Sequence, residues 1–98
     1  MNRLGKWFAD EESTRPQDPF AARLLFECRR VPDNARVLTE LVERFAAHFP
    51  DRILGNPRVH QGTDGNVIEL SLFCLGRGDI DQFNEILERL ARERNLID

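Results

Sequence analysis

Hydrophobic and polar side chains alternate along residues 21–31, AARLLFECRRV, as they do in a β-strand with one buried face. The predicted strand carries Leu24, Phe26 and Cys28 on one side, and Leu25, Glu27 and Arg29 on the other. Pro32 follows it and ends the regular pattern. The pattern therefore predicts a first strand whose two faces differ in polarity.

The spacing of apolar residues changes to a helical period over residues 35–49. The stripe consists of Leu38, Leu41, Val42, Phe45 and Phe49. Asp33 or Asn34 is placed to accept the free backbone N–H groups at the start of this helix, and Pro50 closes it. A first helix is therefore predicted directly after the first strand.

A β-hairpin is predicted next, from a short strand at residues 58–62 and a longer one at residues 66–75. Asp64-Gly65 favours a two-residue turn, since a type I′ turn needs positive φ at both positions. This turn would set the register so that Gln61 faces Ile68, His60 faces Glu69, Val59 faces Leu70 and Arg58 faces Ser71. Val59 then falls on the apolar side of the longer strand.

The second helix is expected to begin at Asp79, an N-cap residue with Gln82 three positions later as in a capping box. Glycines at positions 76 and 78 would let the chain turn from strand to helix. Its buried stripe is formed by Ile80, Phe83, Ile86, Leu87, Leu90 and Ala91.

The order strand, helix, strand, strand, helix predicts an α+β fold of the ferredoxin-like plait type, with two helices on one face of an antiparallel sheet. A full plait has a fourth strand, and only residues 95–98 remain for it. We therefore expect this strand to be short or missing. The exposed edge of the first strand would then be covered by the lead segment or by another copy of the chain.

Residues 1–19 read as a flexible lead segment, and residues 20–98 as a single domain. Within the lead segment, Leu4, Trp7 and Phe8 would share a face if this stretch became helical. They would then form a short hydrophobic anchor, either for the protein's own core or for a partner.

Composition limits the possible functions. A chain of 98 residues with 41% hydrophobic and 32% charged side chains can bury one modest core. Seventeen acidic residues outnumber fourteen basic ones, which argues against general nucleic-acid binding. Two cysteines without a Cys-x-x-Cys pair suggest neither a disulfide scaffold nor a metal site, so we expect a cytoplasmic protein. The first twelve residues contain no long apolar stretch, so we expect no membrane span there.

Candidate chemistry is sparse, and no metal or cofactor is expected. Arg77-Gly78-Asp79 matches an adhesion tripeptide, but its aspartate is already explained as a helix cap. His60 opposite Glu69 could act as a proton carrier, although no nucleophile or second catalytic carboxylate accompanies it. An enzyme is therefore the less favoured hypothesis.

The sheet face away from the helices is the predicted contact surface for a partner. Its members are Leu25, Glu27, Arg29, His60, Glu69, Ser71 and Phe73. The leading hypothesis is a small non-catalytic regulatory or scaffolding module that forms a homodimer and contacts a protein partner. Two alternatives are a small-ligand sensor, with its ligand near residues 76–79 at the positive end of the second helix, and an enzyme that uses His60.

The strand–helix–hairpin–helix order is similar to that of amino-acid-sensing regulatory modules of the ACT type, the cytoplasmic end of small mechanosensitive channels and several dimeric adaptor domains. The run from Arg23 to Phe73, with RLLFECRR as a strand and DGNVIEL after a turn, resembles the bacterial division topological-specificity factor. None of these resemblances includes a diagnostic motif, so no family is assigned and no residue role is transferred.

Overall fold

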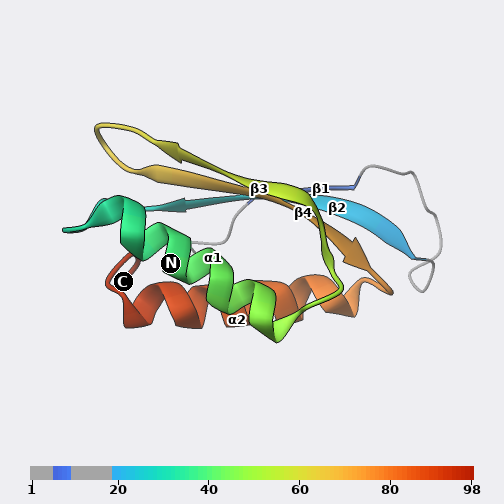
Figure 1. Ribbon diagram of the computed structural model, residues 1–98. Helices are drawn as coiled ribbons and strands as arrows, with labels where there is room; N and C mark the ends of the chain where they lie inside the picture. The colour runs from blue at the N-terminus through green and yellow to red at the C-terminus, as the bar shows by residue number, and fades with distance from the viewer. Residues whose placement is uncertain (1–5, 10–18) are drawn as a thin grey trace.

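The computed structural model describes residues 6–9 and 19–98; of residues 6–9 it describes the backbone. These residues form a small α+β fold whose sheet lies over two helices (Figure 1). The elements are β1 (Lys6–Ala9), β2 (Phe20–Cys28), α1 (Asn34–His48), β3 (Ile53–Gln61), β4 (Asn66–Cys74) and α2 (Gly78–Glu93). The order from β2 onward confirms the predicted β-α-β-β-α arrangement, which is consistent with a ferredoxin-like topology.

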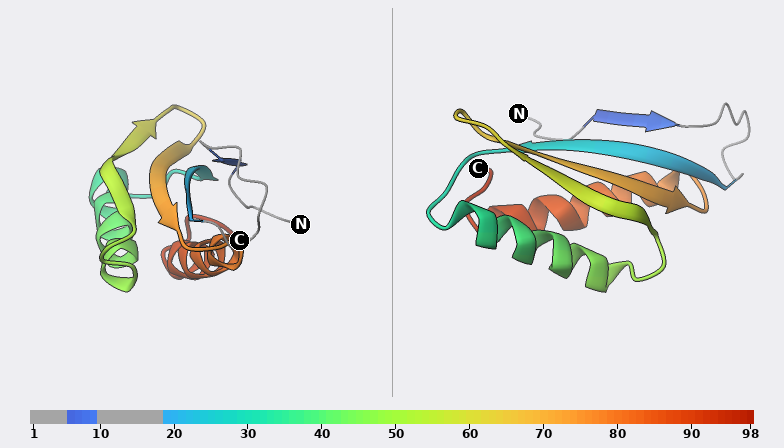
Figure 2. Two further views of the ribbon diagram at one scale, coloured as in Figure 1. Left: turned by 90° about the vertical axis from the view of Figure 1, so that its right-hand side faces the viewer. Right: turned by 45° about the horizontal axis from the view of Figure 1, so that its top comes forward.

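Three long antiparallel strands form the body of the sheet, with β4 between β2 and β3. Both helices cover the same face, and we call the opposite face the outer face (Figure 2). Every second residue of β4 is buried, as the predicted alternation requires. The core consists of Phe20, Ala22, Leu24, Phe26, Cys28, Leu38, Leu41, Phe45, Ile68, Leu70, Leu72, Cys74, Phe83, Leu87, Leu90, Ala91, Leu96 and Ile97.

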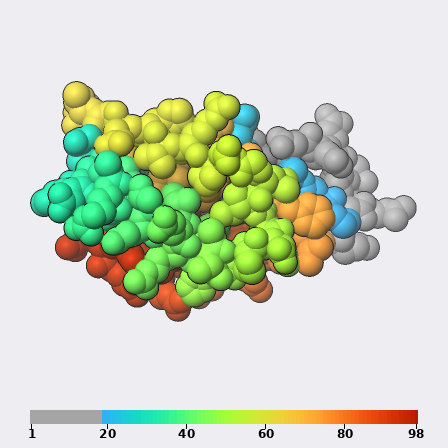
Figure 3. All heavy atoms as spheres, in the orientation of Figure 1, coloured from blue at the N-terminus to red at the C-terminus, as the bar shows by residue number. Residues whose placement is uncertain are grey.

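The hairpin between β3 and β4 differs from the prediction in its turn. The turn spans residues 62–65 rather than two residues, and the Gly62 N–H donates to the Gly65 carbonyl at 2.8 Å. A Cβ atom at Gly65 would lie 2.9 Å from the Cys28 carbonyl oxygen, so this position needs glycine. The hairpin tip stands above the N-terminal end of α1 (Figure 3).

The predicted register is therefore wrong by two residues. Val59 faces Ile68, Arg58 faces Glu69 and His60 faces Val67. A shift of two keeps every side chain on its original face, because the side-chain period of a strand is two. The assignment of residues to the two faces thus survives the error in the turn, although Val59 on the edge strand remains 37% exposed.

A bulge divides β3 between Leu54 and Arg58. Residues 55–57 there stand opposite one residue of β4, and Gly55 has φ of 69°, in the left-handed region. Pro57 has no N–H to donate to a ladder. The bulge explains why the sequence suggested only a short strand after the Asn56-Pro57 pair, whereas β3 begins at Ile53.

Three aromatic rings join the helices at one end of the core. The Phe49 and Phe83 rings pack edge to face with centroids 4.7 Å apart. Phe45 lies 5.2 Å from the Phe49 ring and 6.1 Å from the Phe83 ring. These contacts confirm that the apolar stripes predicted for the two helices face each other and the sheet.

The helix starts differ from the predicted caps. Asp33 precedes α1 in a left-handed conformation and makes no side-chain cap hydrogen bond, and the residue before α2 is Arg77 rather than Asp79. Asn34 is buried, and its Nδ2 donates to the Asn66 Oδ1 at 2.8 Å. In return Asn66 Nδ2 donates to the Asn34 Oδ1 and to the Arg29 carbonyl, each at 3.0 Å. This amide pair fastens α1 to the hairpin and to the end of β2.

The chain after α2 folds back under the core. Asn95 has φ of 61°, and the Leu96 N–H donates to the Ala91 carbonyl at 2.9 Å, as in a Schellman helix end. Leu96 and Ile97 are buried, and the Leu96 carbonyl accepts a 2.8 Å hydrogen bond from the Arg29 N–H. Residues 95–98 therefore close the core and do not form a fourth strand.

The outer edge of β2 is instead paired with β1, antiparallel, with Lys6 opposite Leu25 and Ala9 opposite Ala22. Four residues of the predicted lead segment thus belong to the sheet. The predicted anchor of Leu4, Trp7 and Phe8 required this stretch to be helical, whereas residues 6–9 form a strand. Leu4 lies outside the described residues, whereas Trp7 and Phe8 are part of β1. Neither helix in the described part of the chain is long and apolar enough to cross a membrane.

The buried amide pair gives a test of the fold. We expect Asn66→Ala to lower the free energy of unfolding by about 2 kcal/mol, because the Asn34 amide and the Arg29 carbonyl lose their buried partner. Urea unfolding followed by circular dichroism measures this change. Gln82→Ala, on the exposed side of α2, should stay within about 0.5 kcal/mol of the parent. Equal stability of the two variants would contradict a structural role for the pair.

Candidate functional site

The outer face is built from alternate residues of the three long strands, and no described helix covers it (Figure 2). Its rows run across β2, β4 and β3 in register: Arg23, Ser71 and Leu54; Leu25, Glu69 and Arg58; Glu27, Val67 and His60. Phe73 lies opposite Ala21 at one end. Six of the seven predicted contact residues, Leu25, Glu27, His60, Glu69, Ser71 and Phe73, therefore do share this face.

Arg29 is the predicted member that lies elsewhere. β2 ends at Cys28, and the Arg29 side chain forms an ion pair with the Asp98 carboxylate at the end of the sheet. The assignment of Arg29 to this face is therefore wrong, because the prediction extended the strand three residues too far. The face carries Arg23 and Arg58 instead, and the alternation of residues 21–27 already places Arg23 with Leu25 and Glu27.

His60 and Glu69 do approach each other, as predicted, although they are not directly opposite. His60 Nε2 lies 3.3 Å from Glu69 Oε1 along a diagonal of the ladder. The Glu69 side chain is 24% exposed and the imidazole is mostly exposed. Ser71 lines the same hollow as Glu69 but makes no hydrogen bond to this pair. No group of three metal-ligating side chains occurs in the described residues. The pair can hold or share a proton, but nothing beside it supplies a second catalytic group.

A polar hollow of about 350 Å³ lies on the outer face beside the bulge in β3. Its lining comprises Arg23, Leu54, Gly55, Asn56, Arg58, Glu69 and Ser71. Arg58 and Glu69 are direct cross-strand neighbours, yet no ion pair within 4.0 Å joins them in the described structure. Two opposite charges thus flank an open space on the sheet.

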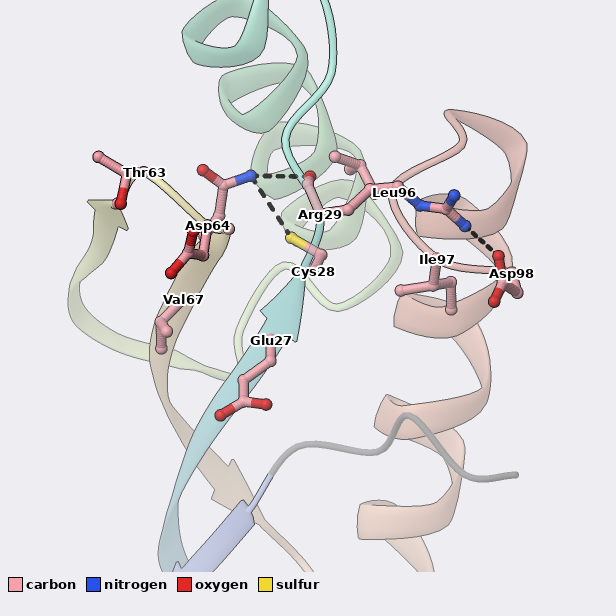
Figure 4. A pocket seen from close by; sticks show the side chains of 12 residues that line it. Glu27, Cys28, Arg29, Thr63, Asp64, Val67, Leu96, Ile97 and Asp98 are labelled. Atoms are coloured by element: carbon pink, nitrogen blue, oxygen red, sulfur yellow. Dashed lines mark hydrogen bonds and ion pairs between the residues drawn. The ribbon is translucent and has the colours of Figure 1, made fainter.

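A second hollow, of about 590 Å³, lies at the end of the sheet (Figure 4). The end of β2, the hairpin turn and the last three residues form its walls, with the Glu27, Asp64 and Asp98 carboxylates around it. Its one cation, Arg29, is already paired with Asp98. Arg30 also ties the turn to the end of β2, donating to the Gly62 carbonyl at 2.9 Å. This hollow is a junction of three chain segments, and its lining offers no reactive pair.

Cys28 and Cys74 are buried free thiols on the helix-covered face, as predicted. Burial raises the pKa of both thiols, and for Cys74 the nearby Asp79 carboxylate raises it further, to about 11. Asn66 donates weakly toward the Cys28 sulfur at 3.9 Å. A high pKa and lack of access make both cysteines unsuited to nucleophilic catalysis.

The start of α2, proposed as an anion site for a sensor, already holds an anion of the protein itself. One oxygen of Asp79 accepts hydrogen bonds from Arg52 Nη1 and from the Leu75 N–H, both at 2.7 Å. Partial burial by itself raises the pKa of Asp79, but the bonds from Arg52 and Leu75 outweigh it and hold the pKa below its ordinary value of 3.8. The carboxylate occupies the place that a ligand anion would need.

The Arg77-Gly78-Asp79 triplet is likewise used within the molecule. The Arg77 guanidinium carbon lies 5.5 Å from the centre of the Phe20 ring, a cation–π distance. Asp79 is paired with Arg52, and Gly78 is the first residue of α2. Both charged ends of the triplet therefore have partners within the molecule, Phe20 in β2 and Arg52 directly before β3.

Comparison of the chain with protein-family models, with curated protein sequences and with solved structures gave no match in any of the three.

The Arg52–Asp79 pair predicts how stability depends on pH. The folded-state pKa of Asp79 is lower than its ordinary value of 3.8. The ionised carboxylate therefore stabilises the fold fully above pH 3.8, and this contribution disappears as the pH falls through the folded-state pKa. We expect Asp79→Asn to lower the free energy of unfolding by about 1 kcal/mol at neutral pH. This gap between variant and parent should close in acid, where Asp79 is protonated. Urea unfolding across a pH series measures the gap. Asp81→Asn, an exposed carboxylate in the same first turn of α2, is the control. A stability difference that widens in acid would contradict the assignment.

The buried thiols predict slow chemical modification. Raising the pKa of Cys74 from 9.0 to about 11 lowers its thiolate fraction roughly a hundredfold at neutral pH, and burial further denies access to reagent. A chromogenic disulfide reagent should therefore label neither cysteine quickly in the native protein and both quickly in denaturant. Asp64→Cys, at the exposed hairpin turn, should add one rapidly reacting thiol. Rapid native labelling of Cys28 or Cys74 would show that their side of the core opens.

Proposed function

We propose that the protein is a small non-catalytic regulatory or scaffolding module that self-associates through the outer face of its sheet. The observation that carries this proposal is that one face of the sheet is sealed by helices while the other, uncovered by any described helix, mixes apolar and charged residues. Half-buried Leu25, Val67 and Phe73 lie there, together with Leu54, which is 41% exposed. Apolar groups ringed by polar ones are typical of protein contact surfaces.

A second copy of the chain is the occupant that the charges favour. On the three long strands, the outer face carries two arginines, Arg23 and Arg58, and two glutamates, Glu27 and Glu69. A twofold axis brings each residue of a face against another part of the same face. A surface with equal numbers of both signs can pair unlike charges under such an axis, whereas a surface of one sign would repel its copy.

Face-to-face contact is favoured over edge pairing. β1 already occupies the outer edge of β2, and the opposite edge, β3, is interrupted by the bulge at residues 55–57 and by Pro57. Bulges and prolines are the devices by which natural sheets prevent edge-to-edge addition. Of the two coverings expected for the edge of the first strand, the lead segment provides one through β1, which leaves the outer face for association with a second copy.

Two finer assignments accompany this proposal. We infer that the domain is a ferredoxin-like plait in which β1 takes the position of the fourth strand, since the order β1-β2-β4-β3 places it beside β2. We also infer a reducing compartment such as the cytoplasm. The support is that both cysteines are free thiols, each on its own strand of the core.

The mass in solution tests the proposal. Light scattering coupled to gel filtration should give twice the chain mass of 11.4 kDa. Leu54→Glu, which puts a further charge on the outer face, should shift the protein to the monomer mass and weaken self-association about tenfold or more.

The matched control for this experiment is Leu75→Glu. Leu75 is a leucine of similar exposure, 52%, in the connection between β4 and α2, beyond the last paired residue of β4. This variant should keep the dimer mass. A parent protein that stays monomeric at every accessible concentration, or a dimer that both variants leave unchanged, would refute association through the outer face.

A further inference from the structure

We propose that the hollow beside the β3 bulge binds a small zwitterion such as a free α-amino acid, with its carboxylate at Arg58 and its ammonium group at Glu69. This site goes beyond self-association and does not rest on it. The inference begins from the unusual relation of Arg58 to Glu69, two opposite charges in adjacent strands that leave a space between them.

Directly opposite residues on one face of a sheet have Cβ atoms about 5 Å apart, close enough for arginine and glutamate to bond. Yet Arg58 has no carboxylate within 4.0 Å in the described structure, and the sole ion-pair partner of Glu69 there is His60. His60 contacts Oε1 of Glu69, which leaves the other carboxylate oxygen available to a donor. A guanidinium and a carboxylate that face the same space without meeting can both be satisfied by a molecule that carries both charges.

The bulge creates this space. Three residues of β3, 55–57, stand opposite one residue of β4, so the strand bends away from a flat ladder. Gly55 adopts φ of 69°, and a Cβ atom built there would meet no atom within 4 Å. Backbone without a side chain therefore borders the hollow, which is the arrangement found where a ligand approaches a strand closely.

The remaining lining suits a small polar ligand. Ser71 and Asn56 add a hydroxyl and an amide, and Leu54 supplies one apolar wall. Arg23 lines the same hollow from β2, and Arg58 supplies the guanidinium group for a ligand carboxylate. A volume of about 350 Å³ is at the small end of the range for metabolite sites. The Arg58 guanidinium disfavours a simple cation, while the Glu69 carboxylate repels a simple anion.

The experiment is a nuclear magnetic resonance titration of the isotopically labelled full chain with individual free amino acids at millimolar concentration. Amide shifts should appear around residues 54–58 and 69–71 and should saturate with at least one amino acid. Acetate and methylamine, which each keep only one of the two charges, should bind about tenfold or more weakly than glycine. The hollow is on a surface, so the measurement is made at low salt, where surface electrostatics are strongest.

Variants distinguish this site from general surface binding. Arg58→Gln and Glu69→Gln keep the size of each side chain and should each weaken binding about tenfold or more. Arg44→Gln, on the exposed surface of α1, removes a cation elsewhere and should leave the affinity unchanged. Absence of saturable shifts with every amino acid would overturn the proposal. Equal binding of acetate and glycine would also overturn it, by showing a simple anion site.

The titration is interpreted together with the mass in solution measured without ligand. A protein that is monomeric without ligand and binds glycine at these residues would refute self-association and support the zwitterion site. A dimer that neither dissociates nor shows saturable shifts with any amino acid would do the reverse. The spectra of the two glutamine variants also report folding directly, because a misfolded variant loses the dispersed amide signals.

Discussion

The structure depends on the two-sided character of β4. This central strand is paired on both edges, and its alternate residues from Asn66 to Cys74 are buried while those between them are partly exposed. Burial of the four apolar members, Ile68, Leu70, Leu72 and Cys74, removes the middle of the sheet from water and fixes which face the helices must cover. A register error of one residue in either neighbour would place apolar side chains on the outer face. The helices, the core and the polar outer face all follow from this alternation.

Periodicity was sufficient to predict this part of the fold. The apolar stripes of α1 and α2 and the alternation of β2 and β4 are sustained over several turns or pleats, so each residue reinforces the same assignment. The turn between β3 and β4 was not predictable in the same way. Asp64-Gly65 is a strong local signal for a two-residue turn, but the Gly62 N–H bonds to the Gly65 carbonyl and closes a four-residue turn instead. That error was harmless for the site, since a displacement of two residues conserves the facing of His60 and Arg58.

Errors that changed the environment of a residue came from contacts distant in sequence. Arg29 continues the alternating pattern of β2, but its backbone N–H binds the Leu96 carbonyl and its side chain binds Asp98, 69 residues away. Asp79 likewise has the residue type and position of a helix cap, yet Arg52 from the start of β3 holds its carboxylate. No local rule contains these partners. The closing of the core by Leu96 and Ile97, which left the edge of β2 to β1, belongs to the same class of long-range effects.

The two proposals for the outer face are linked through shared residues. Arg58 and Glu69 line the hollow, and they are also two of the four charges that a second copy would pair with. A zwitterion bound between them neutralises both charges within one chain and withdraws them from the partner. Ligand and second copy therefore compete for the same charges, and linkage requires each to weaken the other by the same factor. Such competition would let a small polar metabolite release the dimer without any change in the core, because every charge involved lies on the face of the sheet that the helices leave uncovered.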